Sequence, residues 1–324
     1  MTQQLYFLRD TKVFIKIGSD IWEIPVLDGL SFSQATNASE IVLAEMESTA
    51  GVSRRGKRKF NDSLAPVDWS FATYMRPFAS AGSGAGQASN VVSETRAVEE
   101  VLWALLAGPA SYSNTTYDWS ADSTVSNPLE YFTWNSASNL MTIDFAQSNK
   151  STLGTASIIF QVGDANQKYY EVTLAVVNEA AIDFDIDGIA KINWTGFGST
   201  IVETTVPTRT VYEAITSTTN FIRNRLTTLV VTPNQASYSS GDLETTYNVT
   251  LTGGNITITN NITYITPEEL GLVNIPIGHV TGGRSFSGAF TAYLVDDTTN
   301  INETADLWQD MSVLTNIVTH DFNL

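Results

Sequence analysis

The sequence predicts a mainly β protein made of two strand-rich halves, and three observations lead to this expectation. Charged residues form only 16% of the 324 residues, against about 25% in an average soluble domain. Thr, Ser and Asn supply the remaining polarity, which is typical of strands and turns. Short alternating runs of apolar and polar residues recur along the chain, and a set of similar segments occurs twice in the same order.

The composition excludes several classes of site. The chain contains no Cys, so disulfides, thiolate zinc sites, iron–sulfur clusters and cysteine nucleophiles are ruled out. Acidic residues number 34 against 17 basic ones, a net charge of −17, so we expect no binding of nucleic acid or anionic lipid through bulk charge. The sequence has no run of 18 apolar residues and no secretory signal after Met1, which predicts a soluble, cytosolic chain without membrane insertion.

The first strands are predicted from alternation and turn residues. Lys12 to Ile17 and Trp22 to Leu27 flank Gly18-Ser19-Asp20, a hairpin signal. Leu30 to Val42 alternates less strictly. In Trp69 to Tyr74, large apolar and small residues alternate, as in a strand with one buried face.

A flexible loop and a helix are predicted next. Residues Ser80 to Asn90 have the composition of a flexible linker. The spacing of the glycines between Gly82 and Gly86 does not fit a dinucleotide-binding loop. A helix follows, with acidic residues in its early turns and a stop at Gly108-Pro109. The acidic residues are Glu94, Glu99 and Glu100, and the apolar face consists of Val98, Val101, Leu102, Leu105 and Leu106. Strands are then expected at Thr155 to Val162 and Tyr169 to Val177.

A strand with an acidic face is expected over Ile182 to Ile192. Asp183, Asp185 and Asp187 fall on the side opposite the intervening apolar residues, and Gly188 is expected to bend the chain. Residues Thr195 to Asn220, rich in Gly, Thr, Pro and Ser, are expected to link the two halves.

The second half repeats features of the first. Phe7-Leu8-Arg9 matches Phe221-Ile222-Arg223, and Phe71 to Tyr74 matches Phe290 to Tyr293. A helix containing Trp103 has a counterpart at Asp306 to Asn316 that contains Trp308. The matched segments occur in the same order in both halves, but the sequence distance between matched segments varies. This predicts one structural unit used twice with different loops. We place the two domains at residues 1–205 and 206–324.

Two blocks of sequence resemble the tail tube proteins of long-tailed phages, most closely those of the T-five type. The first block runs from Arg55 to Leu64 and continues at Trp69-Ser70-Phe71. The second comprises Gly253 to Thr266, Val273 to Gly278 and Thr291 to Leu294. The likeness extends, with gaps, from about Leu8 to the C-terminus.

This resemblance implies two tandem tail-tube β-sandwich or barrel domains, each with one flanking α-helix. It also implies trimeric, pseudo-hexameric rings that stack into a conduit for DNA ejection. The implied partners are other copies of the chain, the tape-measure protein, the tail terminator and baseplate proteins, and DNA in transit without specific binding. The implied location is the virion tail, with assembly in the host cytoplasm. After the helix at Asp306 to Asn316 the closing strands of the second domain are missing, so a longer protein or a neighbouring element would complete that sheet.

Three interpretations of the acidic strand remain open. Asp183-x-Asp185-x-Asp187-Gly188 resembles the opening of a calcium loop, but the twelfth position is Trp194 where a Glu is required. The alternation instead fits a solvated strand face. The family resemblance adds a third interpretation, in which the carboxylates face the lumen and repel DNA.

A basic segment stands out in this acidic chain. Arg54, Arg55, Lys57, Arg58 and Lys59 provide five of the 17 basic residues. A nucleic-acid-binding arm and a solvated loop are both open interpretations. The hypothesis we favour is a loop that contacts an acidic patch on an adjacent subunit or ring.

No catalytic residues, metal ligands or cofactor are expected. His279 lies beside Gly278 in an expected turn, and His320 lies close to the C-terminus, so neither suits a Ser–His–Asp arrangement. Trp22, Trp69, Trp103 and Trp308 are expected in the core. The alternative functions are a carbohydrate-binding or adhesin-like β protein and, more remotely, a glycosidase.

Overall fold

The structure of the chain is a computed structural model. The described residues are 11–41, 58–79, 95–108, 110–113, 118–121, 132–135, 140–143, 153–163, 166–207, 221–226, 228–233, 244–270, 273–296, 302–313 and 322–323. The predicted mainly β class is confirmed, and the sheets are not closed into a barrel. Among these residues no helix has the length and apolar character needed to cross a membrane.

The elements of the described chain follow in sequence order. Those of the first part are β1 (Lys12–Ile17), β2 (Asp20–Ile24), β3 (Ser31–Ile41), β4 (Arg58–Tyr74), β5 (Pro77–Ala79), β6 (Thr95–Ala97), α1 (Glu100–Ala107), β7 (Ala110–Ser113), β8 (Asp118–Ala121), β9 (Phe132–Asn135), β10 (Leu140–Ile143), β11 (Ala156–Val162), β12 (Lys168–Asp185), β13 (Lys191–Gly198) and β14 (Ile201–Thr204). Those of the second part are η2 (Asn224–Leu226), β15 (Leu229–Pro233), β16 (Tyr247–Val249), β17 (Leu251–Thr259), β18 (Ile262–Ile265), β19 (Gly278–Thr281), β20 (Ser285–Ala292), α3 (Thr304–Ser312) and β21 (Phe322–Asn323).

The chain divides into two compact units that interleave in sequence. The first unit contains Met1–Ala180, Ile192–Asn220 and Ile258–Ser285. The second contains Ala181–Lys191, Phe221–Thr257 and Phe286–Leu324. The predicted domain boundaries, at residues 1–205 and 206–324, differ from the boundaries of these units. The two tandem domains stay a prediction.

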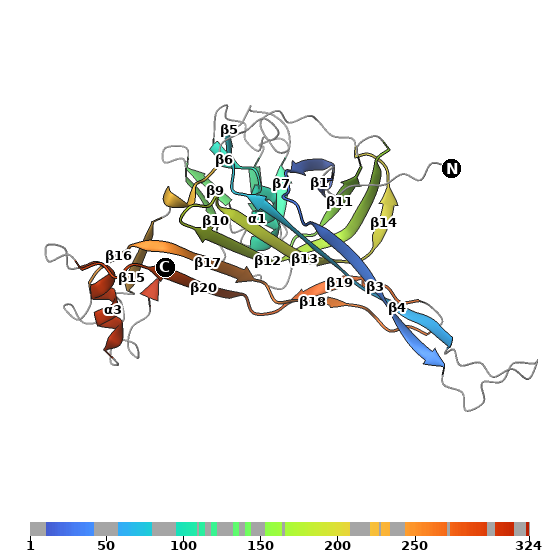
Figure 1. Ribbon diagram of the computed structural model, residues 1–324. Helices are drawn as coiled ribbons and strands as arrows, with labels where there is room; N and C mark the ends of the chain where they lie inside the picture. Colours follow the sequence, from blue (N-terminus) through green and yellow to red (C-terminus); the bar gives the residue numbers. More distant parts are fainter. Residues whose placement is uncertain are drawn as a thin grey trace, which may run out of the picture. The chain divides into compact units, whose positions relative to one another are not determined.

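The main sheet of the first unit has the strand order β2-β1-β11-β12-β13-β4-β3, with β14 paired to β12 (Figure 1). The predicted hairpin between β1 and β2 is confirmed: Ile15 lies opposite Trp22, and Gly18 in the turn has φ +60°. Glycine suits this left-handed conformation because it carries no Cβ. On the other side of β1, Phe14 lies opposite Ile159 of β11.

Alternation along β4 builds one wall of the core, as predicted. Trp69, Phe71 and Thr73 are 2–3% exposed, whereas the residues between them are partly exposed. Trp194 of β13 is fully buried and donates a hydrogen bond from Nε1 to Thr73 Oγ1 at 3.0 Å. Trp103 of α1 meets the Trp194 ring edge-on, with the ring centroids 5.0 Å apart.

Helix α1 lies inside the first unit, because all eight of its residues are buried. Its apolar face and its end before Gly108 agree with the prediction. Its start does not: Glu99 is the N-cap residue, and Thr95–Ala97 forms β6, which pairs with β5. Pairing with β5 therefore prevails over the helical pattern there. Glu94 and the predicted loop Ser80 to Asn90 lie outside the described residues.

Residues 195–204 are not part of a linker, contrary to the prediction. They complete β13 and form β14. Glycine occurs in β13 because neighbouring atoms leave no room for a side chain: a Cβ on Gly196 would lie 2.0 Å from Val176 O and 2.4 Å from Trp69 Cζ2. A glycine that looks like a loop signal in the sequence here permits close packing of a buried strand.

Residues 258–285 pack into the first unit through the β18–β19 hairpin and two polar side chains. Asn260 Nδ2 donates to Leu106 O at 3.0 Å and to Val177 O at 3.2 Å. Arg284 Nη2 donates to Ala107 O at 2.9 Å. These donors satisfy carbonyl groups at the C-terminal end of α1, which have no partner within the helix.

The second unit contains the end of β12, β17 and β20, together with a small sheet of order β16-β15-β21. Helix α3 begins with a capping box, in which the Glu303 and Asp306 side chains bond to each other's backbone N–H groups. The helix lies beside β15 and β16 (Figure 1). Trp22, Trp69 and Trp103 are core aromatics as expected, but Trp308 is 72% exposed, so that prediction is wrong.

Candidate functional site

The acidic strand predicted over residues 182–192 is divided by a turn. Strand β12 ends at Asp185, and Gly188 N–H donates to Asp185 O at 3.0 Å. Buried apolar and more exposed acidic side chains alternate up to that point: Phe184 is buried, Asp183 is partly exposed and Asp185 is exposed. Asp187 lies in the turn rather than on the strand face. A Cβ on Gly188 would lie 2.9 Å from Asn224 Nδ2, the end of a side chain that can move aside.

Asp187 forms an ion pair with Arg225 of η2. Arg225 Nε donates to Asp187 Oδ1 at 3.1 Å, and Nη2 donates to the same oxygen. This hydrogen bond, and then the nearby negative charge, raise the pKa of Arg225. Both side chains are well exposed, so the pair contributes little to stability. Its consequence is electrostatic: the negative charge of Asp187 is balanced locally by Arg225.

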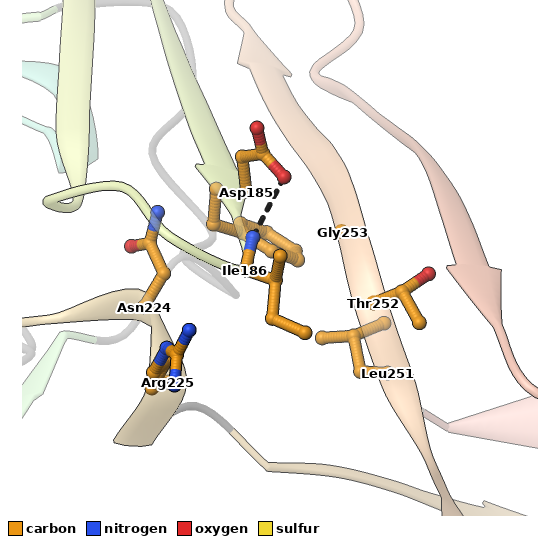
Figure 2. Close-up of a pocket in the computed structure, with 8 residues that line it drawn as sticks. Asp185, Ile186, Asn224, Arg225, Leu251, Thr252 and Gly253 are labelled. Atoms are coloured by element: carbon orange, nitrogen blue, oxygen red, sulfur yellow. Dashed lines mark hydrogen bonds between the residues drawn. The ribbon is translucent and has the colours of Figure 1, made fainter.

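A cavity of about 290 Å³ lies beside this turn, within the second unit. Its wall combines apolar Phe184, Ile186 and Leu251 with the polar side chains of Asp185 and Asn224. Figure 2 shows Asp185 accepting a hydrogen bond from the Ile186 N–H at 2.7 Å. The volume is at the lower limit of sites for small organic ligands, which are about 300–1,000 Å³.

The three aspartates do not converge on a common point. In the described part of the chain, no group of three or more His, Cys, Asp or Glu side chains is placed to hold a metal ion. Asp187 is occupied by Arg225, and Asp185 ends a strand. The arrangement fits a solvated acidic surface better than the calcium loop that the sequence spacing resembles.

The basic segment lies at the connection of the long β3–β4 hairpin. Arg54, Arg55 and Lys57 lie outside the described residues, and Arg58 is the first residue of β4. Lys59 is exposed and forms an ion pair with Glu40, its cross-strand neighbour, at 3.2 Å. One of the five basic residues therefore already has an acidic partner in its own hairpin.

An acidic groove of about 850 Å³ adjoins this hairpin within the first unit. Asp62, Glu268 and Glu269 provide its carboxylates. Phe60 and Leu270 provide exposed apolar surface, and Leu270 is fully exposed. Two backbone hydrogen bonds fix the groove: Leu64 N–H donates to Asn274 O at 2.8 Å, and Asn274 N–H donates to Asp62 O at 3.2 Å. Sequence reasoning missed this groove because its walls are more than 200 residues apart.

His279 lies in β19 and not in a turn, because Ile262 to Ile265 pair with Gly278 to Thr281. Its ring lies 6.1 Å from that of Tyr264, and burial lowers the pKa of the imidazole. His320 lies outside the described residues.

Comparison with known proteins gives one informative similarity. The chain is 29% identical over 307 residues to the tail tube protein pb6 of Escherichia phage T5, an alignment that covers 90% of this chain and 58% of the relative. The chain thus spans somewhat more than half the length of that relative. No family model matches the sequence. The resemblance to T5-type tail tube proteins is confirmed.

Proposed function

We propose that this chain is a structural subunit of a phage tail tube, and that it acts by assembly rather than by catalysis. The similarity to a tail tube protein over 90% of the chain carries the proposal. The mainly β architecture is consistent with it. The proposed location is the virion tail, after assembly in the host cytoplasm.

The proposed assembly is a ring of three chains with pseudo-sixfold symmetry, stacked into a tube. Two related halves in each chain, at residues 1–205 and 206–324, would let a trimer present six similar positions. A closed ring removes the exposed edges that open sheets present. Strands β2 and β3 are such edges, because each pairs with a single neighbour among the described strands.

The acidic end of β12 is proposed to face the lumen. DNA carries one phosphate charge per ~1.7 Å of axis, and the Debye length is ~8 Å at physiological salt. Carboxylates within a few ångströms of the duplex would therefore repel it and prevent adhesion during ejection. Asp183 and Asp185 are the carboxylates of the strand itself, and Asp187 is paired with Arg225 in the turn beyond it. Changing both aspartates to Lys should increase retention of duplex DNA by assembled tubes, and unchanged retention would argue against a lumenal position.

The basic segment Arg54 to Lys59 is proposed to contact an acidic surface of an adjacent subunit or ring. Complementary charge of this kind sets register and association rate more than affinity. Replacing Arg55 and Arg58 with Glu should shorten or abolish tubes while the monomers stay folded. Tubes of normal length from this variant would refute the contact. Further proposed partners are the tape-measure protein, the tail terminator and the baseplate.

The direct test is electron microscopy of the purified chain in negative stain, combined with light scattering to give the particle mass. Rings or tubes of uniform width support the proposal. Dispersed monomers at high concentration that bind glycans would instead support a carbohydrate-binding protein.

A further inference from the structure

An apolar groove of about 650 Å³ lies beside α3, entirely within the second unit. We call it the α3 groove. None of the described residues that line it is charged, and apart from one Thr all are apolar. The lining includes Val231, Val249, Phe290, Leu294, Trp308 and Met311.

Helices α1 and α3 differ in how they are covered. Every residue of α1 is buried, whereas no residue of α3 is. In the α3 groove, Trp308 is 72% exposed, Leu294 is 71% exposed and Met311 is 43% exposed. Contiguous exposed apolar surface of this kind marks an interaction site.

The groove continues into the edge of a sheet. Phe290 and Ala292 of β20 line the groove, and β20 pairs with β17 and with no other described strand. Over Ser285–Ala292 the strand has no charged residue and no proline. Natural sheet edges exposed to water are protected by such residues, so an unprotected edge beside an apolar groove favours pairing with another chain.

We infer that the α3 groove and the adjoining edge of β20 bind a second copy of this chain. This inference rests on the proposed tube function, which requires contacts between copies. Each chain has a net charge of −17, so copies repel one another overall, and a contact between them requires uncharged or oppositely charged surfaces to meet. A groove without charge that contains an exposed Trp satisfies this condition, and Trp is prominent among the residues that dominate protein interfaces. A stable interface needs ~800 Å² per partner, so the groove forms its apolar centre and the strand edge extends it.

The absence of cysteine allows a direct test of this contact by single-thiol labelling. Met311→Cys places a thiol in the groove, and Gln309→Cys places one on an exposed position of the same helix outside the groove lining. Maleimide labelling of M311C should be about tenfold or more slower in assembled particles than in dilute monomer, because a buried thiol is inert. Labelling of Q309C should stay within about twofold. An unchanged rate for M311C in the particles would overturn the inference. So would a rate already slow in the monomer, because another segment of the same chain would then cover the groove.

A charge variant separates this inference from the proposed function. Trp308→Glu should raise the protein concentration needed for assembly about 100-fold, the size expected for a central interface residue. Gln309→Glu adds the same charge outside the groove and should assemble like the wild type. If wild type, Q309E and W308E all form tubes equally well, the groove is not the contact although the tube function stands. If the wild type forms no rings or tubes, the proposed function itself fails. Circular dichroism of each monomer checks the fold.

Discussion

Arg284 Nε donates a hydrogen bond of 2.7 Å to Asn260 Oδ1, and together these side chains hold the end of a helix more than 150 residues away in sequence. Asn260 is 2% exposed and also donates to Val177 O of β12. The pair therefore connects the β18–β19 region, β12 and α1 within the first unit. Buried polar groups that are fully bonded in this way favour one arrangement of the chain.

Replacing Asn260 with Ala should destabilise the protein by about 2 kcal/mol or more, because Val177 O and Arg284 Nε lose their hydrogen bonds to the amide. Urea denaturation followed by circular dichroism measures the loss. Asn255 is exposed on β17 and provides the matched control. A loss for Asn260→Ala no larger than that for Asn255→Ala would contradict the proposed role of the amide.

Stability should depend on pH through Glu99. This side chain is 2% exposed, and burial raises its pKa from the usual 4.5 to about 8, although backbone hydrogen bonds and the charge of Arg76 act in the opposite direction. Between these two pH values the folded chain keeps a proton that the unfolded chain releases. Its contribution to stability therefore declines as the pH rises from about 4.5 to about 8, and levels off above that.

Glu99→Gln removes this titration. The stability difference between E99Q and the wild type should grow in favour of the variant between pH 5 and 8, as measured by urea denaturation at several pH values. Asn255→Ala, which changes no titratable group at an exposed position, should show no such trend. A difference independent of pH would mean that Glu99 is ionised in the folded protein.

Gly196 should tolerate no side chain. Its added Cβ would lie 2.0 Å from Val176 O, so Gly196→Ala forces the backbone or Trp69 to move, at a cost of about 3 kcal/mol or more. Gly283 has no atom within 4 Å of its added Cβ, and Gly283→Ala should be close to neutral. Thermal denaturation of both variants checks this contrast, which fails if the two melting temperatures shift equally.

The monomer should be insensitive to truncation of Trp308. Because the indole is 72% exposed, Trp308→Ala should change the stability of the monomer by less than about 1 kcal/mol. Trp103 is 8% exposed and packs on Trp194, so Trp103→Ala should cost about 3–5 kcal/mol. If Trp308→Ala and Trp103→Ala lowered the stability of dilute, monomeric protein equally, Trp308 would be buried in the monomer.

Local patterns predicted the fold where side-chain alternation was the dominant signal. The boundaries Lys12 to Ile17 match β1, and the alternation from Trp69 to Tyr74 matches the buried face of β4. The prediction failed where distant packing decided the structure. Gly196 belongs to a buried strand because Trp69 and Val176 approach it closely, and neither contact is visible in the neighbouring sequence.

The candidate surfaces were predicted in part. The spacing of Asp183 and Asp185 indicated an acidic strand face, but the sequence did not show that Asp187 would turn towards Arg225. Trp308 was expected in the core because large aromatic side chains are usually buried, and the sequence does not show what covers a given one. The exposure of Trp308 decides that question.

Copies of this chain are proposed to close into rings that stack as a tube. The decisive measurement is the mass of the smallest closed particle, obtained by light scattering together with electron microscopy of the same sample. We expect annular particles with three times the 35.3 kDa mass of the chain, and tubes whose mass is a multiple of that value. A single species of 35.3 kDa at every concentration, without annular particles, would contradict it.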